Sequence, residues 1–313
     1  MWRLAAIASA SAVAFVAVVA VRRRRRSIGP CERIDLRALP ASDVPLKLGV
    51  ENFIDLDAAH ERLGANPVVT HLRSCSSVTR VLDTLHDVII AFLNSVHERV
   101  QTDGESSGYR LLQAGDAGYR NGGVVIQALD ALVADTAILD ASGGPIFIGT
   151  AVVIEPAACI KGPTIIRSGT VIRHGAYLRG DVYLGQQCVV GCECKNVLAM
   201  DEVEMPHHGY VGDSLLGYRA HLGCGAVTAN LPLFEGSVPA VELDGKTYVL
   251  GRRKFGAVLG DRVQLGCGTV TEPGCLLAPH TVCYPLTRLP RGYYGPRELL
   301  KNRPHVERVP LHA

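Results

Sequence analysis

An aliphatic residue recurs at every sixth position between residues 148 and 190, and a small or compact residue follows each one four positions later. The aliphatic positions are Ile148, Ile154, Ile160, Ile166, Ile172, Leu178, Leu184 and Val190, and the compact ones are Val152, Ala158, Thr164, Thr170, Ala176, Val182, Cys188 and Cys194. A period of six fits neither a helix face nor a two-sided strand. It fits a solenoid in which three short strands form one triangular coil of about 18 residues. The pattern therefore predicts a mainly β chain folded as a left-handed parallel β-helix.

The composition agrees with such a hexapeptide-repeat solenoid, because glycine is plentiful, with 33 residues, and aromatic residues make up only 5% of the chain. Tight corners need small residues, and a narrow core is filled by Val, Ile and Leu. We expect the β-helix to span residues 146–290, followed by a C-terminal tail at 291–313. Two interruptions, at 196–206 and 231–254, are where function is expected, because such segments cost ordering entropy without adding core.

Residues 27–145 precede the solenoid and are expected to form a linker and a small helical region. Apolar residues recur at helical spacing between Ser77 and Val100, which predicts one amphipathic helix of about 20 residues. We expect this helix to pack across one end of the solenoid, where it would cover exposed strand edges.

The first 26 residues are predicted to form a membrane anchor. Residues 4–21 are uncharged and mostly apolar, and five arginines follow at 22–26. The length lies at the lower limit for a membrane span, and the arginines favour a body that faces the cytosol. The expectation is a single-pass, membrane-anchored protein, and a cleaved signal segment is the alternative.

The charge balance argues against nucleic acid as a partner. Six of the 32 basic residues lie within the first 26 positions, so the rest of the chain carries more acidic than basic side chains. The cysteines do not suggest a disulfide framework. Cys188, Cys194 and Cys275 fall on inward positions of the repeat, where a free thiol acts as a small hydrophobe.

The stretch at 206–210 contains two adjacent histidines and a tyrosine at the point where the chain re-enters the coil. Asn230 and three cations that the repeat does not require, Arg173, Lys195 and Lys254, lie elsewhere in the solenoid. Because coils stack about 4.8 Å apart, residues far apart in the sequence can line one groove. Cations converging there would suit a phosphate-bearing ligand. A surface loop with incidental histidines and solvated cations is the simpler alternative.

Several ordered motifs resemble the acetyltransferase domain of the bifunctional sugar-1-phosphate nucleotidylyltransferase/acetyltransferases. They occupy residues 162–166, 173–180, 194–196, 206–207, 210–214 and 222–230. Residues 251–261 resemble the archaeal branch in particular. That family carries a nucleotidylyltransferase domain ahead of the solenoid, for which residues 27–145 are too short, so we expect this chain to lack it.

The resemblance implies an N-acetyltransferase that moves the acetyl group of acetyl-CoA to the amine of glucosamine-1-phosphate or galactosamine-1-phosphate, in nucleotide-sugar biosynthesis. The implied catalytic residues are His207, Tyr210 and Asn230, the implied phosphate-binding residues are Arg173, Lys195 and Lys254, and the implied CoA-lining residues are Gly223, Cys224, Gly266 and Cys267. His207 would be the general base, a role that suits a neutral imidazole. The resemblance implies no metal and a homotrimer whose subunits share the groove. A separate nucleotidylyltransferase is a further candidate partner.

Two other interpretations stay open. A catalytically silent β-helix would bind a sugar nucleotide or tether a partner enzyme. A zinc carbonic-anhydrase-like solenoid would draw its ligands from His174, His207, His208 and His221, although the regularly placed histidine pair of such enzymes is missing from the sequence.

Overall fold

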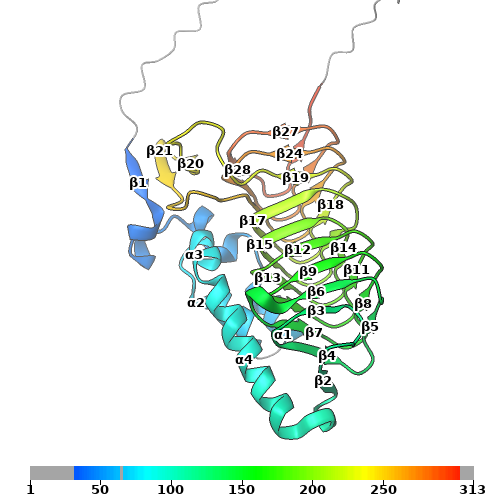
Figure 1. The fold of residues 1–313 in the computed structure, drawn as a ribbon. Coiled ribbons are helices and arrows are strands. Elements are labelled where there is room, and N and C mark those ends of the chain that lie inside the picture. Colours follow the sequence, from blue (N-terminus) through cyan, green and yellow to red (C-terminus); the bar gives the residue numbers. More distant parts are fainter. Residues whose placement is uncertain (1–31, 64–65, 304–313) are drawn as a thin grey trace, which may run out of the picture. The chain divides into compact units, whose positions relative to one another are not determined.

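The computed structural model describes residues 32–63 and 66–303, and its main feature is a stack of parallel coils with three faces (Figure 1). The first face is a nine-stranded sheet in the order β29-β26-β23-β18-β16-β14-β11-β8-β5, and we call it the nine-stranded face. Its members are β5 (Leu132–Val133), β8 (Val153–Ile154), β11 (Val171–Ile172), β14 (Val189–Val190), β16 (Glu204–Met205), β18 (His221–Leu222), β23 (Gln264–Leu265), β26 (Val282–Cys283) and β29 (Leu299–Leu300).

The other two faces share their longest strands, β15 (Glu193–Ala199) and β17 (Tyr210–Leu216), which each bend from one face onto the next. The face that we call the tyrosine face contains β3 (Tyr119–Asn121), β6 (Ile138–Asp140), β9 (Cys159–Lys161), β12 (Tyr177–Arg179), the first halves of β15 and β17, β19 (Val227–Thr228), β24 (Val270–Thr271) and β27 (Arg288–Leu289). The face that we call the helix-covered face contains β4 (Val125–Ala128), β7 (Ile146–Ile148), β10 (Thr164–Ile166), β13 (Val182–Leu184), the second halves of β15 and β17, β22 (Ala257–Leu259), β25 (Cys275–Leu277) and β28 (Gly292–Tyr294).

The core of the solenoid is built from the aliphatic residues of the six-residue repeat. All eight positions from Ile148 to Val190 are at most 1% exposed. The compact positions are buried as well, and the hydroxyl of Thr170 donates to the carbonyl of Gly185 at 2.9 Å, so a polar residue there is satisfied by the neighbouring coil. The prediction of a mainly β solenoid is confirmed.

The solenoid extends further at both ends than the repeat indicated. Val125 pairs in register with Ile146, so a full coil precedes the predicted start at residue 146. Strand β2 (Tyr109–Leu111) pairs antiparallel with β4 on this first coil. At the other end Leu299 pairs with Val282, inside the predicted tail. The repeat does not predict this first coil, because 21 residues separate Val125 from Ile146 and a coil of that length does not keep the six-residue period.

The first predicted interruption, at 196–206, is a shortened coil and not a break. Val197 pairs with Val182, although only 15 residues separate them. Asn196 turns the corner with a φ of 53°, and Asp213 does the same in the next coil with a φ of 47°. A left-handed residue lets the chain turn within a single position, which Asn and Asp tolerate better than most side chains.

The second predicted interruption, at 231–254, is a true insertion with its own secondary structure. It forms a hairpin of β20 (Ala240–Leu243) and β21 (Lys246–Val249), and β1 (Arg33–Asp35) adds to β21 in parallel. The N-terminal region and the insertion therefore share a small sheet.

Within the described residues, the N-terminal region contains four α-helices: α1 (Leu56–Leu63), α2 (Pro67–Ser74), α3 (Val78–Asp83) and α4 (Leu85–Asp103). It also contains short 3-10 helices at Leu36–Ala38, Ala41–Asp43, Leu46–Leu48, Val50–Asn52 and Gly104–Ser107. A further 3-10 helix, Ala141–Gly143, lies in the first coil of the solenoid. The single helix predicted over 77–100 is thus divided into α3 and α4. The division falls at Thr84, whose backbone angles of −114° and 5° leave the helical range.

These helices lie along the helix-covered face (Figure 1), so the predicted cap across one end of the solenoid is wrong. The physical reason is a stripe of outward-facing apolar residues, each placed directly before a core residue: Phe147, Ile165, Tyr183, Leu198, Leu215, Val258 and Leu276. Phe92 of α4 packs edge-on against Phe147, with ring centroids 5.5 Å apart. Covering the whole stripe removes more apolar surface from water than covering one end coil would.

The predicted membrane-anchored, single-pass localisation is corrected by the observed helices. Within residues 32–63 and 66–303, no helix is long and apolar enough to cross a membrane. The predicted anchor or signal segment at 1–26 lies outside the described residues.

Candidate functional site

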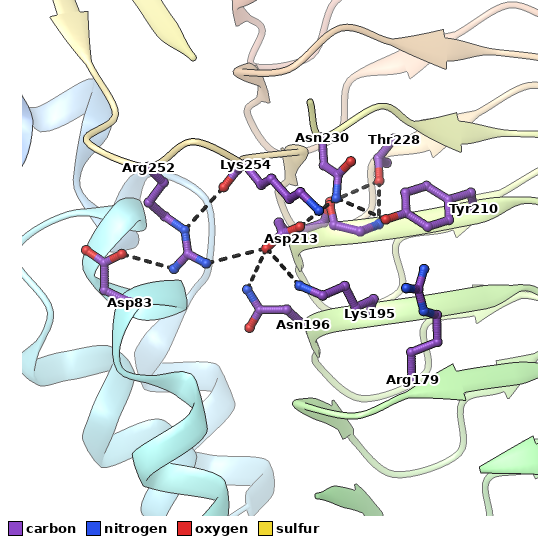
Figure 2. Close-up of polar contacts among 12 residues, drawn as sticks. Asp83, Arg179, Lys195, Asn196, Tyr210, Asp213, Thr228, Asn230, Arg252 and Lys254 are labelled. Atoms are coloured by element: carbon purple, nitrogen blue, oxygen red, sulfur yellow. Dashed lines mark hydrogen bonds and ion pairs between the residues drawn. The ribbon is translucent and has the colours of Figure 1, made fainter. Parts of the chain in front are cut away.

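Polar side chains gather where the tyrosine face meets the helix-covered face, at the corner made by Asn196 and Asp213 (Figure 2). We call this the aspartate corner. Strands β15 and β17 pair in register, with Lys195 opposite Gly212, so the side chains of consecutive coils stack on one another. Asn230 joins them from the next coil, two residues after β19 ends.

Asp213 is the centre of this cluster, and its side chain is only 2% exposed. Its Oδ1 accepts a hydrogen bond from Asn196 Nδ2 at 2.8 Å, and its Oδ2 accepts one from Asn230 Nδ2 at 2.6 Å. Lys195 Nζ lies 3.7 Å from Oδ1, and Arg252 Nη2 lies 3.4 Å from it. Because a buried carboxylate is costly unless it is paired, these four donors satisfy it, and it in turn fixes their positions.

The Tyr210 ring lies beside this cluster because Gly212 leaves room for it. A Cβ placed on Gly212 would be 2.3 Å from the phenol oxygen. Asn230 Nδ2 donates to that oxygen at 2.9 Å, so the phenol proton is left to donate to a ligand. Burial, together with the nearby Asp213 carboxylate, raises the pKa of Tyr210 above its usual value, which keeps the phenol protonated at neutral pH.

The cations at the aspartate corner differ in how they are held. Arg252 lies between two carboxylates, with Nη1 at 3.0 Å from Asp83 Oδ1 on α3 and Nη2 facing Asp213. The Lys195 side chain is 32% exposed, and Lys254 is exposed with its side chain directed toward the cluster (Figure 2). Arg252 is therefore committed to protein carboxylates, whereas Lys195 and Lys254 are accessible to a phosphate.

Arg173 and His207 lie at a different corner, where the nine-stranded face meets the tyrosine face, and we call it the histidine corner. Arg173 directly follows β11 and donates from Nη1 to the carbonyl of Pro206 at 3.3 Å. His207 follows that proline and is exposed, and its ring makes no hydrogen bond to the residues that the structure describes.

The predicted CoA-lining residues continue the histidine corner on the next two coils, after β18 and β23. The amide of Gly268 donates to the carbonyl of Cys224 at 2.8 Å, and Cys224 Sγ lies 3.6 Å from His208 Nδ1. A Cβ on Gly223 would be 2.6 Å from the amide nitrogen of Cys267. Close stacking of coils therefore already requires a glycine at this position.

Within one chain, the predicted site residues therefore lie at two different corners. The aspartate corner holds Lys195, Tyr210, Asn230 and Lys254, and the histidine corner holds Arg173, His207, Gly223, Cys224, Gly266 and Cys267. Tyr210 lies between the corners, three residues after His207 and three before Asp213.

Sequence reasoning missed parts of the aspartate corner. Asp213 and Asn196 stand inside the matched motifs but were assigned no role. A signal was present for Asp213, since an aspartate within a strand of mostly apolar residues is rarely buried unless it is paired. No local pattern indicates Asp83, because its partner Arg252 is 169 positions away.

The structure gives the zinc interpretation no support. In the described part of the chain, no group of three or more His, Cys, Asp or Glu side chains is arranged to hold a metal ion. His221 Nδ1 lies 2.9 Å from Glu204 Oε2, and His208 is next to Cys224, so both rings have other neighbours.

Comparison with known proteins supports the resemblance over part of the chain. A 90-residue segment is 36% identical to the bifunctional protein GlmU of Methanococcus vannielii and covers 29% of this chain and 21% of that protein. A 93-residue segment is 34% identical to the bifunctional sugar-1-phosphate nucleotidylyltransferase/acetyltransferase of Sulfurisphaera tokodaii and covers 30% of this chain and 23% of that protein. Over this segment the chain is homologous to these archaeal proteins. It spans only about a fifth of the length of the curated relatives that it matches.

Two further comparisons add little. No family model matches the chain. The solved structure of AntD, an N-acyltransferase from Bacillus cereus in complex with dTDP and coenzyme A, covers 59% of this chain and 86% of its own, with a TM-score of 0.20 and 13% identity. A likeness at that level supports no conclusion about this chain.

Proposed function

We propose that this protein is an N-acetyltransferase that moves the acetyl group of acetyl-CoA to the amine of a hexosamine-1-phosphate. The observation that carries the proposal is the aspartate corner, in which Lys195, Tyr210 and Asn230 cluster around Asp213 with Lys254 directed toward them. The homology to archaeal sugar-1-phosphate nucleotidylyltransferase/acetyltransferases supports the class of reaction and of acceptor.

In this proposal the acceptor binds at the aspartate corner. Lys195 and Lys254 bind its phosphate by charge-assisted hydrogen bonds. The phenol proton of Tyr210 is available to a sugar hydroxyl or to the thioester oxygen, because the phenol oxygen already accepts a hydrogen bond from Asn230. The acceptor is thereby oriented by groups that Asp213 holds in place.

His207 is proposed to act as the general base. It removes a proton from the amine as the nitrogen attacks the thioester carbonyl, the C–S bond breaks, and the CoA sulfur leaves and takes up a proton. Histidine is the side chain that most often serves for such proton transfers, and the exposed ring of His207 is accessible to an incoming amine. Acetyl-CoA is proposed to lie along the same corner, beside Gly223, Cys224, Gly266 and Cys267.

A homotrimer is proposed to complete the site. Arg173, His207 and the CoA-lining residues lie at one corner of each chain, and the acceptor cluster lies at the other. A neighbouring subunit that places its histidine corner against the aspartate corner would bring the base and Arg173 to the acceptor.

The test is a thiol-release assay with acetyl-CoA and either glucosamine-1-phosphate or galactosamine-1-phosphate. Wild-type protein should release CoA with one of these acceptors, and His207→Ala should lower kcat by about 100-fold to 10,000-fold. The adjacent variant His208→Ala is the matched control and should keep most of the activity. Background rates for both wild type and His207→Ala would eliminate the enzyme and favour a silent, ligand-binding β-helix.

A further inference from the structure

We infer that Asp83, on helix α3, is a positioning residue for acceptor binding, acting through Arg252. The inference rests on the proposed function and deepens it, because it assigns part of the acceptor site to the N-terminal helical region. Asp83 belongs to a segment that precedes the solenoid, and its carboxylate faces the aspartate corner across the insertion at 231–254 (Figure 2).

The geometry links Asp83 to the acceptor cluster through one guanidinium. Arg252 Nη1 donates to Asp83 Oδ1 at 3.0 Å, and Nη2 donates to Asp213 Oδ1 at 3.4 Å. Its Nε donates to the backbone carbonyl of Lys254 at 3.2 Å. The planar fork of arginine thus spans two carboxylates and the backbone of an acceptor-binding lysine. The side chains of Asp83 and Arg252 are 18% and 19% exposed, so water competes weakly for these bonds.

Asp83 matters because Asp213 Oδ1 is shared between several donors. Asn196 Nδ2 occupies it at 2.8 Å, whereas Arg252 and Lys195 lie further away, at 3.4 and 3.7 Å. If Asp83 no longer attracts the guanidinium, Arg252 keeps Asp213 as its remaining carboxylate and moves closer to it. It then competes with Asn196 and Lys195 for the same oxygen.

The expected consequence is specific to the acceptor. Movement of Arg252 shifts Lys195 through Asp213 and shifts Lys254 through its backbone carbonyl, so both accessible cations of the corner lose their arrangement. The proposed CoA-lining residues lie at the other corner and make no contact with Asp83 or Arg252 among the described residues.

The experiment measures acceptor and acetyl-CoA parameters for Asp83→Asn, which keeps the size of the side chain. The KM for hexosamine-1-phosphate should rise about threefold to thirtyfold, with kcat and the KM for acetyl-CoA unchanged. Asp83→Glu should restore most of the acceptor affinity. Arg252→Gln should produce a similar rise, and the double variant should be no worse than Arg252→Gln alone, because the two residues act as one unit.

His86→Gln is the matched control. His86 Nδ1 lies 2.6 Å from Asp181 Oδ1, so this variant also removes a contact between the helical region and the solenoid but does not touch Asp213. It should leave both KM values unchanged. If His86→Gln raised the KM for hexosamine-1-phosphate as much as Asp83→Asn does, the inference would be overturned, because any loss of contact between the helical region and the solenoid would then have the same effect.

Calorimetric titration of hexosamine-1-phosphate without acetyl-CoA separates this inference from the proposed function. If the wild type acetylates the acceptor and Asp83→Asn keeps the wild-type KM and Kd for it, the role of Asp83 is overturned and the proposed function stands. If the wild type binds the sugar phosphate more tightly than Asp83→Asn does but transfers no acetyl group, the proposed N-acetyltransferase function is overturned and the role of Asp83 in acceptor binding stands. Wild type that neither binds nor acetylates overturns both.

Discussion

At the scale of single residues, the missing side chain at Gly212 determines where the Tyr210 ring can lie. A methyl group there would be 2.3 Å from the phenol oxygen and 2.6 Å from two ring carbons, so Gly212→Ala must move the ring away from Asn230. We expect kcat/KM to fall about tenfold or more, the equivalent of one lost hydrogen bond of about 1.4 kcal/mol. Steady-state kinetics measures this. Gly122→Ala is the control, because an added Cβ there would have no atom within 4 Å apart from those of the adjoining residues. Unchanged kinetics in Gly212→Ala would show that Tyr210 has no role in the reaction.

Asp201 provides a prediction about pH. Burial raises the pKa of this carboxyl above its ordinary value of 3.8. A group whose folded-state pKa is raised contributes stability that is fully present below the unfolded-state pKa and is lost as the pH rises through the folded-state pKa. The free energy of unfolding of wild type, relative to Asp201→Asn, should therefore increase as the pH falls from neutral toward 3.8. The asparagine retains the Oδ1 acceptor for the Gln186 amide. Urea unfolding at a series of pH values measures the difference, and a difference that stays constant would contradict the assignment.

At the scale of elements, the six-residue repeat was sufficient to predict the solenoid but not the position of the helices. The core period is local and regular, so it can be read without a structure. The apolar residue that precedes every third core position, as in Phe147 and Ile165, was equally visible in the sequence and explains why helices cover this face. Shortened coils were misread as an interruption, because one left-handed residue such as Asn196 replaces a longer corner.

Helix α4 should stabilise the solenoid through its buried side chains. Leu93 is fully buried against the helix-covered face. Leu93→Ala should lower the free energy of unfolding by about 2–5 kcal/mol, from lost transfer energy and the cavity that remains. The neighbouring Asn94 is exposed, and Asn94→Ala should stay within about 0.5 kcal/mol of wild type. Denaturant unfolding of both variants gives the comparison, and similar losses in the two would show that α4 does not depend on this packing.

At the scale of the whole molecule, the site was predicted as a set of residue types but not as an arrangement. Lys195, Tyr210 and Asn230 do come together, because coil stacking brings in-register residues of consecutive turns side by side. Arg173 and His207 share a different corner, a division that depends on where each strand ends. The role of Asp83 could not be predicted from the sequence, since only folding brings α3 close to the insertion at 231–254.

The division of the site between two corners predicts complementation between inactive subunits. If the base comes from one subunit and the acceptor cluster from the next, then His207→Ala and Lys195→Ala each disable every site in their own trimers. Mixed trimers made by co-expression contain interfaces in which both corners are intact, about a quarter of all sites for random mixing. We expect activity near that fraction of wild type in the purified mixture, with a trimer in sedimentation velocity.

The matched mixture combines His207→Ala with Arg173→Ala, two changes at the same corner. No interface in it can regain an intact histidine corner, so its activity should remain at the mean of the two variants. Activity at the mean in both mixtures would instead require His207 and Lys195 to act within one chain. The acceptor would then have to extend along the tyrosine face, over Tyr210, from one corner to the other.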